Sequence, residues 1–301
     1  MLSTHTTDGP DGRTLQYYTL DSDSADDAGV ESSIPLIWFH GSPNVGEPPV
    51  PLYDAAVGHG IGWIGYDRPG YGGSTANPGR DIASAAKDVE TIADALGIER
   101  FAVMGHSGGG AHALACAALL PDRVGAAVSI SGLAPYPRDG DELTAGIDWF
   151  DGLSEGGAAE LRAALAGREE LERVLKNAEF DPEMFTADDM AMFDGPWNWF
   201  NHVVKLGNAN GIGAFVDDDL AALGDWGFDV LDISVPTLIM HGTADRVVPV
   251  SHARWLARHL PAAQLRLLEG GGHLSVMNGA ADALSWVAQT MTAQTMAAGE
   301  R

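Results

Sequence analysis

The sequence contains a single cysteine and few basic residues. Cys116 cannot form a disulfide within the chain, and alone it cannot supply a zinc site built from several thiolates. Lys and Arg number 17 against 42 Asp and Glu, which gives a formal net charge of −25 at pH 7. So acidic a chain repels phosphate backbones and anionic lipid surfaces, and we expect neither nucleic acid nor a membrane as a partner.

Long apolar runs and several ligand-binding motifs are also missing. No stretch approaches the ~18 uninterrupted apolar residues of a membrane-spanning helix, and the polar first residues do not resemble a secretory signal. No Gly-Lys dipeptide occurs, which excludes a Walker-type phosphate loop, and no His-x-x-x-His pair encloses a glutamate, as a zincin site would require. We therefore expect a cytoplasmic protein that uses neither a cofactor nor a metal.

The rest of the composition is typical of a globular protein. Hydrophobic residues make up 45% of the 301 residues, and eight of them are tryptophan. A chain of this length buries a sizeable core, in one or two structural units, without disulfides or a structural metal. We expect a small molecule as the binding partner, and association into a homo-oligomer stays open.

Short apolar runs alternate with helical patterns along most of the chain. Six runs bounded by Gly or Pro are typical of strands covered on both faces: Pro35–Phe39, Ile61–Tyr66, Phe101–Gly105, Ala126–Ile130, Thr237–His241 and Leu265–Leu268. The helical patterns are Asp81–Leu96, Ala111–Leu120, Val250–Leu260 and Ala280–Met296. This alternation predicts a parallel α/β sheet, and we interpret the earlier patch Leu15–Leu20 as an edge strand.

One interval breaks the alternation. Between about Pro135 and Asp225 the sequence is helical in pattern, acidic and rich in Trp, Phe and Met, with no convincing strand. It predicts a helical subdomain with its own small core, or a cap whose aromatic underside closes a pocket, and the two interpretations are compatible. We place this domain at residues 135–226 and the core domain at residues 1–134 and 227–301.

The strongest chemical signal is the G-x-S-x-G motif from Gly105 to Gly109, which follows an apolar run and precedes a helical pattern. A sharp turn from strand to helix exposes the middle residue, here Ser107, in a strained backbone conformation. Glycines two positions before and after it leave room where the strand and the helix nearly touch. The motif predicts that Ser107 is a nucleophile, and the alternative is a glycine-rich turn with an incidental serine.

A serine nucleophile needs a base that a carboxylate orients. Asp245 follows the predicted strand Thr237–His241, and His273 follows the predicted strand Leu265–Leu268. The chain order Ser107, Asp245, His273 is expected when the three residues stand at the ends of strands in one sheet. We predict that they form a catalytic triad.

A tetrahedral intermediate also requires two backbone N–H donors in a water-poor site. Gly108 follows the nucleophile at the start of a helix and is the first predicted donor. The second is expected in the loop His40–Pro43, where Pro43 has no N–H. Of Gly41 and Ser42 we choose Ser42, and the alternative is that this loop is only a tight turn.

These residues resemble those of the α/β-hydrolase superfamily over roughly residues 13–297. The matching positions are His40-Gly41-Ser42-Pro43, Asp67 to Ser74, Gly105 to Gly109, Asp245 and His273. The resemblance implies an eight-stranded, mostly parallel sheet with helices on both faces, a helical cap inserted after the sixth strand, and cofactor-independent hydrolysis through an acyl-serine. Haloalkane dehalogenases and epoxide hydrolases share the first two motifs but use an aspartate where this chain has Ser107.

The expected function is that of a serine carboxylesterase acting on a small, largely apolar ester or lactone. The runner-up is an aminopeptidase similar to the prolyl iminopeptidases, although these usually carry His-Gly-Gly-Pro-Gly where this chain has His40-Gly-Ser-Pro-Asn44. A third hypothesis is a non-catalytic small-molecule binder, because a fold alone does not establish an activity.

Overall fold

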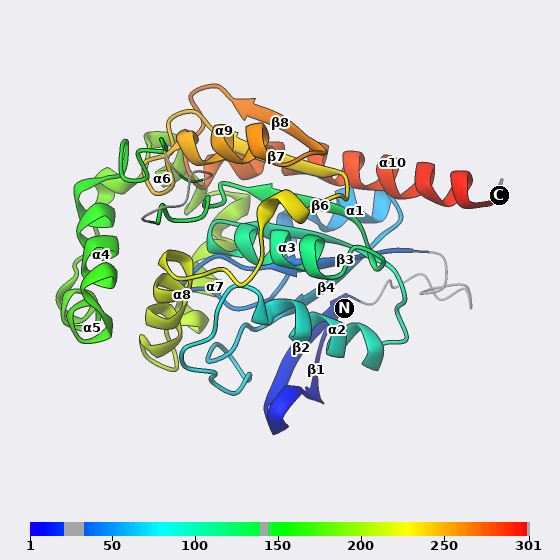
Figure 1. Cartoon of the computed structure of the whole chain (residues 1–301), viewed down its shortest axis with the longest axis horizontal. Helices are drawn as coiled ribbons and strands as arrows, with labels where there is room; N and C mark the ends of the chain where they lie inside the picture. The colour runs from blue at the N-terminus through cyan, green and yellow to red at the C-terminus, as the bar shows by residue number, and fades with distance from the viewer. Residues whose placement is uncertain (21–32, 139–143, 145, 300–301) are drawn as a thin grey trace.

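The computed structural model describes residues 1–20, 33–138, 144 and 146–299 of the protein. A single eight-stranded sheet runs through it (Figure 1). The strands are β1 (Leu2–Asp8), β2 (Thr14–Leu20), β3 (Ile34–Phe39), β4 (Ile61–Tyr66), β5 (Phe101–His106), β6 (Val124–Ile130), β7 (Thr237–Gly242) and β8 (Ala263–Leu268). Their order across the sheet is β1-β2-β4-β3-β5-β6-β7-β8. The pairs β1–β2 and β2–β4 are antiparallel and all others are parallel, which confirms the mostly parallel sheet.

Two expectations about individual strands are wrong. The patch Leu15–Leu20 is not an edge strand, because β2 lies between β4 and the additional strand β1. Strand β1 has no buried residue, so it gave no apolar signal in the sequence. At the opposite edge β8 is not covered on both faces, since Leu265 and Leu267 are 40% and 36% exposed.

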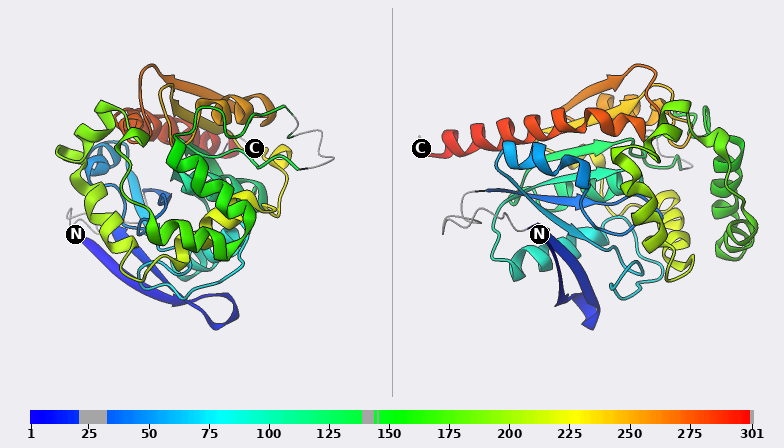
Figure 2. Two further views of the ribbon diagram at one scale, coloured as in Figure 1. Left: turned by 90° about the vertical axis from the view of Figure 1, so that its left-hand side faces the viewer. Right: turned by 180° about the vertical axis from the view of Figure 1, so that it is seen from behind.

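Helices cover both faces of the sheet (Figures 1 and 2). On one face lie α2 (Ser84–Ala95), α3 (Gly108–Leu119) and α9 (Val250–His259), and on the other lie α1 (Tyr53–Gly58) and α10 (Ala280–Gly299). The central strand β5 supplies both cores, because Val103 joins the first hydrophobic cluster while its neighbours Ala102 and Met104 join the second. This explains why the central strands read as continuous apolar runs.

The described residues between β6 and β7 form five α-helices, as expected for an insertion after the sixth strand. They are α4 (Glu155–Ala166), α5 (Arg168–Asn177), α6 (Ala187–Met192), α7 (Trp199–Gly207) and α8 (Gly213–Leu223), and the described residues of this interval form no strand. Figure 2 shows them gathered at one end of the molecule. Most of their buried apolar residues belong to the same two hydrophobic clusters as the core helices. The boundaries at 135 and 226 stay a prediction.

No helix in the described ranges is both long and apolar enough to cross a membrane.

Two acidic residues face each other inside the insertion, Glu160 on α4 and Asp219 on α8. Burial raises the pKa of Glu160 to about 7 from its usual 4.5, and burial together with the Glu160 charge raises the pKa of Asp219. A carboxyl group whose pKa is raised by folding stabilises the fold below its unfolded pKa, and that contribution is lost as the pH rises through the folded pKa.

In the wild type, the melting temperature should therefore fall as the pH rises from about 4.5 to about 7, because Glu160 loses its proton. We predict that Glu160→Gln removes this fall. Above pH 7 the variant should melt at a higher temperature than the wild type, because it carries no buried charge at this position. Calorimetric melting temperatures across this pH range test it, with the exposed Glu179→Gln as control. Parallel pH profiles of the wild type and Glu160→Gln would contradict the prediction.

Candidate functional site

Ser107 stands at the sharp turn between β5 and α3. Its backbone has φ 57° and ψ −131°, a left-handed conformation that a residue with a side chain rarely adopts. The flanking glycines explain how this turn is possible: a Cβ on Gly105 would lie 2.1 Å from the Gly109 carbonyl oxygen, and one on Gly109 would lie 2.2 Å from the Phe39 oxygen. The Ser107 N–H donates to the Ile130 carbonyl at 2.8 Å, which ties the turn to β6.

The structure brings Ser107, His273 and Asp245 into one hydrogen-bonded chain. The Ser107 Oγ lies 2.9 Å from His273 Nε2, and His273 Nδ1 lies 2.8 Å from Asp245 Oδ2. The other oxygen of Asp245 accepts from the N–H groups of Val247 at 2.9 Å and Val248 at 2.8 Å. These three side chains, which are 166 positions apart end to end, meet where β5, β7 and β8 end.

Asp245 carries a negative charge in this arrangement although it is almost fully buried. Burial by itself raises the pKa of Asp245, but the charge of His273 and hydrogen bonds from His241 and His273 outweigh it and hold that pKa well below its usual range. A buried carboxylate next to Nδ1 fixes the tautomer of the His273 ring that leaves Nε2 free to accept the serine proton. Asp225 and Asp229, two acids that precede β7, accept from the nearby N–H groups of Gly227 and Leu231 and do not reach His273 among the described interactions.

The loop that carries His273 is held by Asp189, a residue of α6 to which sequence reasoning gave no role. Asp189 Oδ2 accepts from the N–H of His273 at 3.1 Å, and Oδ1 accepts from Leu274 at 2.9 Å and Ser275 at 2.7 Å. Burial raises the pKa of Asp189, but the backbone hydrogen bonds lower that pKa by more than burial raises it. The carboxylate therefore stays ionised. The helical insertion thereby fixes the backbone of the histidine.

His106, the residue before Ser107, contacts the same loop through its side chain. Its Nε2 lies 2.9 Å from the His273 carbonyl oxygen, and its ring packs against those of Phe200 and His273. Burial and the charge of His273 lower the pKa of His106 to about 3, so the ring is neutral and Nε2–H donates.

The two predicted oxyanion donors lie side by side. A Cβ built on Gly108 would be 3.1 Å from Ser42 Oγ, and one on Gly41 would be 3.2 Å from the Cβ of Ser107. Within the described residues, neither the Ser42 N–H nor the Gly108 N–H donates to a protein acceptor. Gly108 also begins α3, whose N-terminal end favours negative charge.

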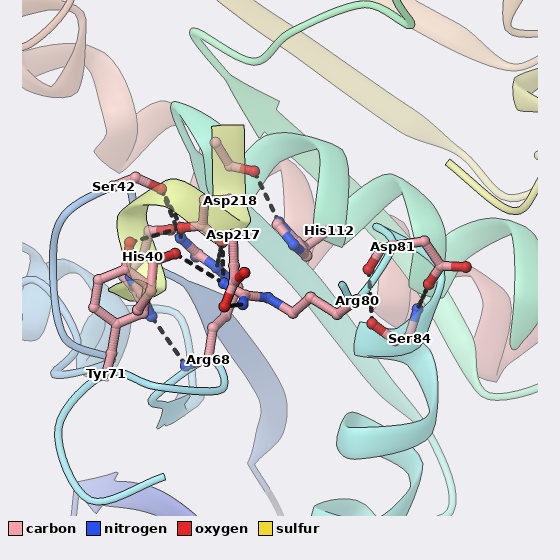
Figure 3. Close-up of polar contacts among 12 residues, drawn as sticks. His40, Ser42, Arg68, Tyr71, Arg80, Asp81, Ser84, His112, Asp217 and Asp218 are labelled. Carbon is pink, nitrogen blue, oxygen red and sulfur yellow. Dashed lines mark hydrogen bonds and ion pairs between the residues drawn. The ribbon is translucent and has the colours of Figure 1, made fainter. Parts of the chain in front are cut away.

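A buried network of charged residues joins the Ser42 loop to α8 (Figure 3). Asp218 on α8 pairs with Arg68 at 2.6 Å and with Arg80 at 2.6 Å, and it accepts from the Ser42 hydroxyl. Arg80 also pairs with Asp217 at 3.3 Å. Sequence reasoning assigned no role to any of these charged residues, and the only hint was three consecutive acids, Asp217 to Asp219, on an otherwise small and apolar helix.

A cavity of about 610 Å³ lies beside this site, between α6, the short helix η4 (Pro196–Asn198) and the loop after β8. The residues that line this cavity include Met192, Trp197, Leu268 and Ser275. Neither Ser107 nor His273 lines it.

Comparison with known proteins agrees with the fold. A sequence model described as the alpha/beta hydrolase fold matches residues 34–280. The chain is 30% identical over 264 residues to a non-heme chloroperoxidase of Streptomyces lividans, covering 82% of this chain and 87% of that protein. Among solved structures it is similar to the enol-lactonase of Burkholderia xenovorans LB400 (TM-score 0.67, 19% identity, covering 96% of this chain and all of that one). It is also similar to the esterase RhEst1 of Rhodococcus sp. ECU1013 (TM-score 0.67, 19% identity, covering 96% and 98%).

We predict that Asp189→Ala loosens the histidine loop, because the backbone N–H groups of residues 273–275 lose their acceptor. Each such bond is worth about 1 kcal/mol, so amide hydrogen exchange at residues 273–275 should accelerate about tenfold or more. Mass-spectrometric exchange measures this directly. The matched control is Asp188→Ala, its exposed neighbour on α6, which should leave the rates unchanged. Equal rates in the two variants would show that Asp189 does not hold the loop.

Proposed function

The chain belongs to the α/β-hydrolase family and is a hydrolase, and from that premise we propose that it cleaves an uncharged carboxylic ester or lactone through an acyl-serine on Ser107. The observation that carries the proposal is the hydrogen bond of 2.9 Å between Ser107 Oγ and His273 Nε2, with Asp245 behind the imidazole. A serine hydroxyl is a weak nucleophile until a base of this kind takes its proton.

In the first half-reaction His273 removes the Ser107 proton as Oγ attacks the substrate carbonyl. The carbonyl oxygen becomes an oxyanion that the N–H groups of Ser42 and Gly108 stabilise, and Asp245 stabilises the imidazolium. The C–O bond then breaks, and His273 protonates the departing alcohol. In the second half-reaction water loses a proton to His273, attacks the acyl-serine and releases the carboxylic acid with Ser107 restored.

An uncharged substrate is favoured by the charges around Ser42. Arg68 and Arg80 are the nearest cations to this loop in the described network, and both are 1% exposed and paired with Asp218. Neither guanidinium is therefore free to bind a substrate carboxylate. On the side of His106, Phe200 of α7 packs between Trp197 and His106. Apolar rings this close to Ser107 favour an apolar acyl or alcohol group.

An aminopeptidase needs an acidic residue that holds the substrate's free amine. Three buried acids of the insertion are already engaged: Asp189 with backbone N–H groups, and Asp217 and Asp218 with arginines. These pairings support the ester over the amide as substrate.

The chloroperoxidase relatives suggest a second activity of the same site. Hydrogen peroxide in place of water could give up its proton to His273 and attack the acyl-serine. This step forms a peroxy acid and restores Ser107, and the peroxy acid is the oxidant for halide. The Streptomyces lividans relative, at 30% identity, is the observation that favours this candidate. Its test is halide oxidation that requires both peroxide and a carboxylic acid or ester and is lost in Ser107→Ala.

We predict that Ser107→Ala lowers kcat for p-nitrophenyl butyrate by at least about 10³-fold and abolishes labelling by a fluorophosphonate probe, because the nucleophile is gone. Thermal stability should not fall, since alanine adds no bulk at the turn. Ser285→Ala, on the outer helix α10, is the control and should keep both activities. Labelling that persists in Ser107→Ala would refute the assignment of the nucleophile.

We also predict that p-nitrophenyl butyrate is turned over at least about tenfold faster than proline p-nitroanilide, because the site offers a paired rather than a free carboxylate to an amine. Initial rates at matched substrate concentration test this. The reverse order would favour the aminopeptidase. Tight stoichiometric binding of ligands without any turnover would favour the non-catalytic binder.

A further inference from the structure

The N–H of Ser42 belongs to a peptide group whose carbonyl is held from several directions. The oxygen of that group, Gly41 O, lies 2.7 Å from His40 Nδ1, 3.1 Å from the Asn44 N–H and 3.4 Å from Arg68 Nη2. His40 Nε2 accepts from the Arg68 N–H at 3.1 Å, so Nδ1 carries the proton and donates. In a trans peptide the C=O and the N–H point in opposite directions, so fixing the oxygen also aims the Ser42 N–H.

The side chain of Ser42 is held as well, and by two opposite charges. Its Oγ accepts from Arg68 Nη2 at 2.9 Å and donates to a carboxylate oxygen of Asp218. Arg68 also donates to the His40 carbonyl through Nη1. One guanidinium therefore touches three consecutive residues of the loop, from His40 to Ser42 (Figure 3).

A guanidinium this deeply buried needs a counter-charge to stay in place. Arg68 is 1% exposed, and Asp218 accepts from its Nη2 at 2.6 Å and from its Nε at 3.3 Å. Asp218 is itself fixed by Tyr71 Oη at 2.9 Å and Arg80 Nη2 at 2.6 Å. Tyr71 and Arg80 belong to the core domain, whereas Asp218 comes from α8 of the insertion.

We propose that Asp218 is a positioning residue for the oxyanion site: it holds Arg68 and the Ser42 hydroxyl, and these hold the Gly41–Ser42 peptide so that its N–H meets the developing negative charge beside Gly108. Asp218 does not touch the substrate. The inference rests on the proposed function of Ser107 as the nucleophile. It makes the helical insertion part of the machinery that stabilises the transition state.

The neighbouring acid, Asp217, is a matched control within the same helix. The side chains of Asp217 and Asp218 have the same exposed fraction, 5%, and both pair with Arg80. Asp217 bonds to Arg168 but makes no contact with Ser42 or Arg68 among the described interactions. Substitution of either residue removes a buried charge, but only Asp218 reaches the loop.

The experiment compares Asp218→Asn with Asp217→Asn on p-nitrophenyl butyrate, with folded active sites counted by fluorophosphonate titration. We expect kcat per site to fall about 10- to 100-fold in Asp218→Asn with KM within about twofold, because a misaimed donor weakens the transition state more than the bound substrate. Binding of phenylboronic acid, whose tetrahedral adduct on Ser107 places an oxygen at the oxyanion position, should weaken by a similar factor. Asp217→Asn should keep kcat and boronate affinity within about threefold.

A second variant covers the case in which Asp218→Asn does not fold. Ser42→Ala removes the hydroxyl link to Asp218 and Arg68 while keeping the Ser42 N–H and every ion pair. It should lower kcat and boronate affinity together, by about 10-fold, with KM little changed.

Four outcomes are distinguishable. Parallel losses in kcat and boronate affinity for the Asp218 or Ser42 variants, with Asp217→Asn spared, support the inference. Equal losses in Asp218→Asn and Asp217→Asn would reduce Asp218 to a structural role and overturn it. Unchanged kcat in the folded variants would overturn it while leaving the proposed function intact. A wild-type protein that neither hydrolyses esters nor reacts with the probe would overturn the proposed function and this inference with it.

Discussion

The close approach of β5, α3 and the loop after β3 is the constraint on which the site depends. A Cβ on Gly109 would overlap the Phe39 carbonyl, and one on Gly105 would overlap Gly109, so no other residue type fits at these two positions. Because strand and helix are this close, the residue between them must turn through a left-handed conformation, and its side chain points away from the sheet. The same proximity places the Gly41–Ser42 peptide against Gly108. Backbone packing thus brings the proposed nucleophile and the proposed donors together.

The helical insertion contributes a carboxylate to each of two loops of the candidate site. Asp189 of α6 holds the backbone of His273, and Asp218 of α8 holds the Ser42 loop through Arg68. Both acids are buried and both remain ionised, because N–H groups or guanidinium groups surround them. Phe200 of α7 packs against His106, which precedes Ser107. An insertion that looks like a separate cap in the sequence is therefore joined to the catalytic loops by charge and hydrogen bonds as well as by apolar contact.

The sequence was informative where local chemistry determines structure. The Gly pattern around Ser107 predicted the turn, and Asp245 and His273 were identifiable because each follows an apolar run that becomes a strand. It was uninformative where a residue acts through distant partners: Asp189 lies 84 positions from His273, and Asp218 lies 150 from Arg68. The sequence around an acidic residue in a helix is the same whether its side chain faces solvent or pairs with a buried arginine. The edge strand β1 was missed for another reason: it buries no residue, so its sequence carries no apolar run of an interior strand.

The balance of charge around Ser42 bears on which reactions this site favours. The protein is strongly acidic, with a net charge of −25, yet the proposed reaction concentrates negative charge on one oxygen. A free arginine beside Ser42 would stabilise that oxygen, but it would also bind any anionic substrate or product before the reaction occurs. Pairing Arg68 with Asp218 cancels the net charge and leaves oriented N–H dipoles as the local positive groups. Dipoles of fixed direction discriminate by geometry: they bind weakly to a planar carbonyl and strongly to the oxyanion that forms at the point where they converge. On this reasoning the buried ion pair serves to aim the donors, and its neutrality keeps them selective for the transition state.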